Sequence, residues 1–203
     1  MKIKYKKIAY LTLDNGKVIH LEHIGEGLFC HAWKNQKHVY IITKQKSDWS
    51  KEIICGLSGN PYFPKCKFIG DLEINAFGKI IDSRVYIMPL YRKLTPNDKE
   101  AWKMANELMK IRTEEWVKIT NKYYNKRLPV ESVGWDFMNN IINRLTSNKL
   151  KKALKELMNL SANYGSSYAF EFSKDNLSVS NKGHLILRDV IYDLTSVFQK
   201  FNK

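Results

Sequence analysis

The hydrophobic periodicity of this chain changes near Leu94. Before that residue, short apolar runs alternate with polar turns such as Asp14-Asn15-Gly16, a pattern typical of antiparallel strands. After it, apolar residues recur every three or four positions, as they do on one face of a helix. We therefore expect an α+β fold in which an N-terminal antiparallel sheet of roughly five strands, with one helix, precedes a mostly helical region.

The bounds of the expected elements follow from the same patterns. Gly56, Gly59 and Pro61 should end the first helix, and Leu128-Pro129 should separate two later ones. We expect strands at 10–13, 17–24, 30–33, 38–43, 67–70 and 84–88, and helices at 47–57, from Thr95-Pro96 to about Tyr123, at 133–145 and at 149–164. We find no internal repeat or low-complexity linker, so we expect one domain over 1–203, with a sheet-rich lobe at 1–90 and a helical lobe at 91–203.

The chain carries a formal net charge of +14, spread along its length, and 28 of its 34 basic residues are lysines. Lysine contacts phosphate as a point charge and lacks the forked geometry with which arginine reads bases. Nucleic acid is therefore expected as a partner only through non-specific charge. We also find no apolar run long enough for a signal peptide or a membrane span. We expect no membrane partner and a cytoplasmic location, in the host cell if a phage encodes the chain.

The segment from Glu171 to Asp189 contains the clearest chemical signal. Two apolar runs, Leu177–Val179 and His184–Leu187, flank a glycine-containing turn, which predicts a small β-hairpin. This hairpin brings Asn176 and the two carboxylates to one end of a β-ribbon. An amide oxygen and a carboxylate are the ligands that hold Mg²⁺ on nucleotide phosphates. The sequence therefore predicts a Mg²⁺ site formed by Asn176 and Asp189.

The sheet-rich lobe contains weaker signals. Gly25 and Gly27 lie between two expected strands, where glycines let backbone amides approach a phosphate, although a plain turn has the same appearance. Strand alternation places Ile42 and Lys44 on one face. The five histidines lie in or beside expected strands, without a ligand-spaced pair on a helix, so we expect no metal site among them.

The order of these features resembles that of the protein kinase family. Residues 25–29 are similar to the kinase glycine-rich loop, and residues 41–44 to the strand whose lysine grips the α- and β-phosphates of ATP. The resemblance implies that a helix carboxylate orients that lysine and that Met88 is the gatekeeper before a hinge that binds adenine. The nucleotide-binding residues implied in this way are Gly25, Gly27, Phe29, Ile42, Lys44, Glu52, Met88 and Leu90.

The Glu171–Asp189 segment resembles the kinase catalytic loop and the metal-binding Asp that follows it. The family has an Asp where this chain has Glu171, and the third glycine of the loop motif is Cys30 here. The resemblance implies that Glu171, Lys44 and Asp189 are catalytic and that Asn176 and Asp189 hold the metal. Because fourteen residues follow Asp189, we expect a two-lobed kinase-like fold that is truncated after this residue.

The function that the resemblance implies is that of a minimal, atypical kinase of the kind carried by phages and bacterial pathogens. Such an enzyme would use ATP and Mg²⁺ to transfer the γ-phosphate to a hydroxyl of a protein, on Ser, Thr or Tyr. The alternative is a pseudokinase that engages and inhibits a cellular protein with little or no catalysis, because Glu171 and Cys30 depart from the family pattern. A third hypothesis is a nucleic-acid binding protein that uses the net positive charge.

Overall fold

The computed structural model describes residues 8–12, 16–27, 30–44, 49–76, 79–124, 130–165 and 168–193. The chain divides into two compact units. The sheet unit contains Met1–Asp48 and Lys65–Leu90, and the helical unit contains Trp49–Pro64 and Tyr91–Lys203. The expected α+β class is confirmed, since an antiparallel sheet comes first and most of the helices follow it.

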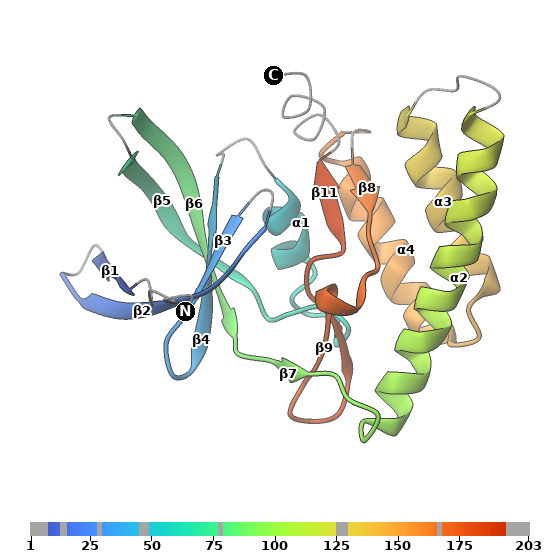
Figure 1. The fold of residues 1–203 in the computed structure, drawn as a ribbon, viewed down its shortest axis with the longest axis horizontal. Helices are drawn as coiled ribbons and strands as arrows, with labels where there is room; N and C mark the ends of the chain where they lie inside the picture. Colours follow the sequence, from blue (N-terminus) through green and yellow to red (C-terminus); the bar gives the residue numbers. More distant parts are fainter. Residues whose placement is uncertain are drawn as a thin grey trace, which may run out of the picture. The chain divides into compact units, whose positions relative to one another are not determined.

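The described residues of the sheet unit form a six-stranded antiparallel sheet with the strand order β1-β2-β3-β4-β6-β5 (Figure 1). Its longest strands, β5 and β6, extend into residues that the sequence assigned to a polar connection, with Asp71 paired to Arg84 and Ala76 to Lys79. Residues 71–75 alternate polar and apolar residues, as a strand does. The strands are β1 (Ile8–Thr12), β2 (Val18–Glu26), β3 (Cys30–Lys34), β4 (His38–Thr43), β5 (Lys67–Ala76) and β6 (Lys79–Pro89).

One face of this sheet forms a small hydrophobic core. Tyr40 and Ile42, two residues apart on β4, lie on the same face, and Ile42 is paired with Val85 of β6. These side chains pack with Leu11 and Leu21 from the first two strands. The face of β4 that carries Tyr40 and Ile42 therefore contributes to this core.

In the described part of the helical unit there are four helices and two small antiparallel sheets, one of β7, β9 and β10 and one of β8 and β11. Helices α2, α3 and α4 pack in sequence order, α2 on α3 and α3 on α4 (Figure 1). The elements are α1 (Ser50–Gly56), β7 (Arg92–Lys93), α2 (Lys99–Tyr124), α3 (Val130–Arg144), α4 (Asn148–Ala162), β8 (Tyr168–Phe170), the 3₁₀ turn η1 (Lys174–Asn176), β9 (Leu177–Val179), β10 (Leu185–Leu187) and β11 (Ile191–Asp193).

Helix α1 belongs to the helical unit, whereas we expected it in the sheet-rich lobe over 1–90. The side chains of Ile53 and Ile54 are fully buried in the large core that also contains Leu154 and Leu157 of α4. The close packing of α1 on α4 at Gly56 leaves little space, since a Cβ there would lie 2.8 Å from Leu160 Cδ2. Because its apolar side chains are buried in the core formed by the later helices, α1 belongs to the helical unit.

Helix α2 begins at Lys99 instead of at Thr95, where the sequence placed its start. The reason is Asp98, whose carboxylate accepts hydrogen bonds from the Thr95 N–H at 2.9 Å, from the Thr95 hydroxyl and from Arg92. These bonds hold 95–98 as a turn, and the first helical bond then runs from the Trp102 N–H to the Asp98 carbonyl at 2.8 Å. Within the described residues, the length and hydropathy of the helices do not suit any of them to span a bilayer.

Candidate functional site

The predicted residues of the helical unit gather around the β9–β10 hairpin. The pairing of Leu177 with Leu187 continues beyond the strands, because the Arg188 N–H donates to the Asn176 carbonyl at 2.8 Å. On the other side of Asp189, the Val190 carbonyl accepts from the Glu171 N–H at 3.0 Å. Asp189 thus lies between Arg188, which is bonded to Asn176, and Val190, which is bonded to Glu171. These two bonds bring the backbones of the three predicted residues close together.

The side chains of this group are open to solvent to different degrees. Glu171 is exposed and Asn176 is partly buried. The Asp189 side chain is 47% exposed, although the apolar residues on either side of the group, Leu187 and Val190, are fully buried. The hairpin thus anchors these polar groups on a rigid apolar base and leaves them accessible to a ligand.

Lys51 of helix α1 forms an ion pair with Asp189 Oδ1. Its side chain is only 5% exposed, which makes it a buried cation whose charge this carboxylate compensates. From the sequence we selected its neighbour Glu52 and overlooked Lys51. A signal was present, because Lys51 precedes Ile54 by three residues and so shares the buried face of α1 with it.

A second cation lies beside the same carboxylate. Burial lowers the pKa of the Arg188 guanidinium, while the negative charges of Asp189 and Asp175 oppose this shift. The Arg188 Nη2 also donates to the Asp175 carbonyl at 2.5 Å. Burial raises the pKa of Tyr192, and the charge of Glu171 raises it further. Asp189 therefore lies beside two cations, Lys51 and Arg188, which balance its charge within the described part of the helical unit.

In the sheet unit, Lys44 binds the glycine turn directly. Its Nζ lies 2.5 Å from Glu26 Oε1 and 2.9 Å from the Gly27 carbonyl oxygen. Neither Gly25 nor Gly27 has a positive φ, and a Cβ would meet nothing within 4 Å at Gly25 and nothing closer than 3.8 Å at Gly27. The fold alone does not require glycine at these positions. Because they have no side chain, the space beside the backbone is open to a ligand.

The other predicted nucleotide contacts have different surroundings. Ile42 is buried in the core of the sheet unit and Met88 is also buried, so neither is exposed as a contact surface. Leu90 is 45% exposed, and its N–H donates to the Lys37 carbonyl at 3.3 Å. Leu90, Tyr40 and Ile87 are among the residues that line a pocket of about 980 Å³ in this unit. Its lining combines these apolar side chains with polar ones such as Lys17, His20 and Asn35.

Glu52 and Phe29 are the two remaining predicted residues. Glu52 is partly buried in the first turn of α1, in the helical unit, and the carboxylate that holds Lys44 within the sheet unit is Glu26. Phe29 lies outside the described residues. The pairing of Lys44 with Glu52 therefore stays a prediction.

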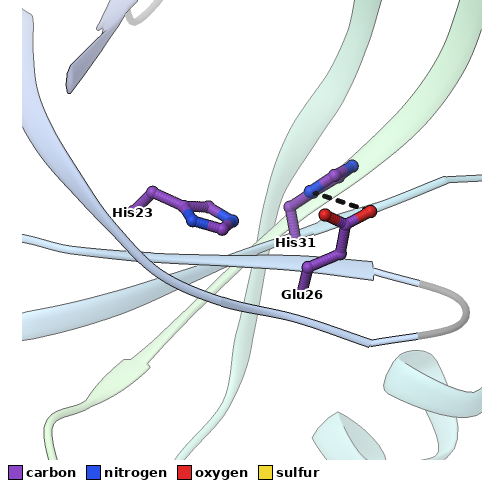
Figure 2. Close-up of side chains that lie close together, drawn as sticks. All are labelled: His23, Glu26 and His31. Carbon is purple, nitrogen blue, oxygen red and sulfur yellow. Dashed lines mark ion pairs between the residues drawn. The ribbon is translucent and has the colours of Figure 1, made fainter. Parts of the chain in front are cut away.

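Three side chains on β2 and β3 form a cluster that we did not anticipate from the sequence. One nitrogen or oxygen atom of each of His23, Glu26 and His31 lies within 4.8 Å of those of the other two. Figure 2 shows the imidazole of His23 pointing toward the other two side chains, with His31 Nδ1 3.9 Å from Glu26 Oε1. The cluster is a group of two imidazoles and a carboxylate on adjacent antiparallel strands.

No protein-family model matches this sequence, and the search of curated proteins found no significant match. The comparisons therefore identify no family for the chain, and its function is argued from the residues and their geometry alone.

Proposed function

We propose that this protein is an atypical kinase, which uses ATP and Mg²⁺ to phosphorylate a hydroxyl group of a protein. The observation that carries this proposal is the backbone arrangement that brackets Asp189 between Asn176 and Glu171. Phosphoryl transfer asks for positioning and charge neutralisation more than for covalent chemistry, so a metal-binding pair next to one further carboxylate is the minimum that it needs.

Each predicted residue then has a distinct role. Asn176 and Asp189 offer the hard oxygen ligands that Mg²⁺ prefers, and the exposed part of Asp189 leaves room for the ion. When bound, Mg²⁺ neutralises the phosphate oxygens of ATP. Glu171 orients the hydroxyl that accepts the phosphoryl group, and Lys44 binds phosphate oxygens. The pocket beside Tyr40, Ile87 and Leu90 is the surface that we propose for adenine.

Ligand binding must replace two ion pairs that the described residues already form. Lys44 has to leave Glu26 to reach a phosphate, and Mg²⁺ competes with Lys51 for Asp189. Each exchange gives Lys44 or Asp189 a new partner of opposite charge. It also separates Glu26 from Lys44 and the buried Lys51 from Asp189, so ligand binding has to offset that cost. We therefore expect substitution of Lys51 by Met to lower the Mg²⁺ concentration that half-saturates the enzyme, because the competing ammonium is gone.

The test is phosphate transfer from radiolabelled ATP to proteins of a cell extract, in the presence of Mg²⁺. We expect labelling by the wild-type protein and its loss in Asp189→Asn and in Lys44→Met. Asp82→Asn is the matched control, because Asp82 is an exposed carboxylate of the sheet unit without an assigned role, and this variant should keep the activity. Equal labelling by wild type and Asp189→Asn would refute the proposal.

A pseudokinase is the second candidate, and the buried Lys51 is the observation that favours it. An ammonium on Asp189 supplies the positive charge that a metal ion would otherwise provide, so the fold is complete without Mg²⁺. Glu171, one methylene longer than the Asp of the kinase family, points the same way, since a misplacement of about an ångström can cost roughly a hundredfold in rate. Thermal melting with and without Mg-ATP, combined with the labelling assay, distinguishes the two, because a pseudokinase shows no transfer whether or not it binds nucleotide.

A further inference from the structure

The cluster of His23, Glu26 and His31 exists because β2 contains a bulge. His23 and Glu26 are three residues apart, and such odd spacing places side chains on opposite faces of a regular strand. The pairing of β2 with β3 shifts between His23 and Gly25, so that His23 is opposite Trp33 while Glu26 is opposite His31. The bulge thereby turns all three side chains to one face, which is how bulges re-aim side chains near functional sites.

The surroundings of His23 indicate a missing ligand. Its Nε2 is buried, and within the described part of the chain it has no hydrogen-bond partner. The ring packs edge-on against the indole of Trp33, with 4.8 Å between ring centroids, and this contact fixes its direction. A buried polar nitrogen without a partner is costly, and an imidazole that faces a second imidazole and a carboxylate can recover this cost by binding a cation.

We propose that His23, Glu26 and His31 bind a divalent transition-metal ion of the zinc class. Two imidazole nitrogens and one carboxylate oxygen are a common ligand set for such ions, and a fourth position remains for water or another ligand. Ligand atoms around tetrahedral zinc lie about 3.3 Å apart, since each is roughly 2 Å from the metal. The present separations of up to 4.8 Å close to that value with small side-chain rotations, for which the exposed Glu26 has room.

The same carboxylate also binds Lys44, and this gives the site a further property. Because the ammonium lies 2.5 Å from Glu26 Oε1, it competes with a metal ion for the charge of Glu26. Metal binding should therefore weaken the contact between Lys44 and Glu26. The metal site itself does not depend on the proposed kinase activity, since all of its ligands come from one hairpin of the sheet unit.

The experiment is a titration of the full chain, produced without a histidine tag and freed of metal with a chelator. Zinc affinity is measured by competition with a chromophoric chelator, and Co²⁺ serves as a visible probe of ligand geometry. We expect one tight zinc ion per chain and a visible Co²⁺ absorption typical of four-coordination. His23→Gln and His31→Gln should each weaken binding by more than about tenfold. His20→Gln is the matched control, since His20 also lies on β2 but outside the cluster, and it should bind as the wild type does.

Thermal melting shows whether each variant still folds. Without metal, the three variants should melt within a few degrees of the wild type, and zinc should raise the melting temperature of the wild type and of His20→Gln only. Removal of the competing ammonium in Lys44→Met should make zinc binding severalfold tighter. The proposal is overturned if the wild-type chain binds no stoichiometric zinc, or if His23→Gln and His31→Gln bind it as tightly as the wild type.

Discussion

Removal of Asp189 should destabilise the fold much more than removal of its partner Lys51. The two side chains have very different environments, because Lys51 is 5% exposed and Asp189 is 47% exposed. Asp189→Ala leaves a buried ammonium without this carboxylate, and loss of one partner of a buried pair costs about 3 kcal/mol or more. Lys51→Met replaces the lysine stem by an apolar chain of similar volume and leaves a carboxylate that water can solvate, so we expect a cost below about 1.5 kcal/mol.

The double variant Lys51→Met with Asp189→Ala makes this prediction sharper. Once the buried charge is gone, loss of the carboxylate should add little, so the double variant should be more stable than Asp189→Ala alone. Urea unfolding followed by tryptophan fluorescence measures the effect. With a slope of about 2 kcal/mol per molar urea, a loss of about 3 kcal/mol lowers the midpoint by about 1.5 M. Asp82→Ala controls for loss of an exposed carboxylate in the sheet unit and should change stability by less than about 0.5 kcal/mol.

The reasoning is refuted if Lys51→Met is as destabilising as Asp189→Ala, or if the double variant is the least stable of the three. Either result would mean that the ammonium of Lys51 does not depend on the carboxylate of Asp189. The Lys51–Asp189 ion pair would then give no information about how charge is balanced at this site.

Two further predictions concern the packing and the charges of the helical unit. Gly134→Ala should lower stability by about 1 kcal/mol, because a Cβ on α3 would lie 3.0 Å from the Tyr168 carbonyl oxygen of β8. Gly59→Ala is the control: a Cβ there meets nothing within 4 Å, so the urea midpoint should stay nearly unchanged. Equal effects of the two substitutions would contradict this prediction. The hydrogen bond from Arg92, followed by those from Thr95, lowers the pKa of Asp98 from 3.8 to about 2, so Asp98 stabilises the fold above pH 4 and loses this contribution as the pH falls from about 4 to 2. Asp98→Asn should therefore be less stable than wild type at pH 6, with a gap that narrows toward pH 2 in unfolding measurements, and a gap independent of pH would show that this carboxylate has no lowered pKa.

The local elements of this fold could be predicted from the sequence where turn chemistry and periodicity agree. The β9–β10 hairpin has the expected strands, and its turn places Gly183 at a φ of +79°, which a glycine adopts at little cost. Ser147, in the expected turn before α4, accepts a hydrogen bond from the Leu150 N–H at 3.3 Å as the helix cap. Both features depend only on residues close together in the chain.

The features that the sequence did not predict depend on residues far apart in the chain or on a break in the side-chain alternation of a strand. Lys51 and Asp189 are 138 positions apart, and no local pattern connects them. The His23, Glu26 and His31 cluster requires a bulge, which reverses the strict alternation that a regular strand over β2 would have. The unit to which α1 belongs is likewise decided by the burial of Ile53 and Ile54 in a core formed by much later helices.

The most direct test of the proposed function is a crystal structure of the protein with a non-hydrolysable ATP analogue and magnesium. We expect the Lys44 ammonium to contact a phosphate oxygen, and Asn176 and Asp189 to hold Mg²⁺ on the phosphates, with Lys51 displaced from Asp189. A nucleotide bound away from both Lys44 and Asp189, or no bound nucleotide at saturating concentration, would contradict the proposal that this chain is a kinase.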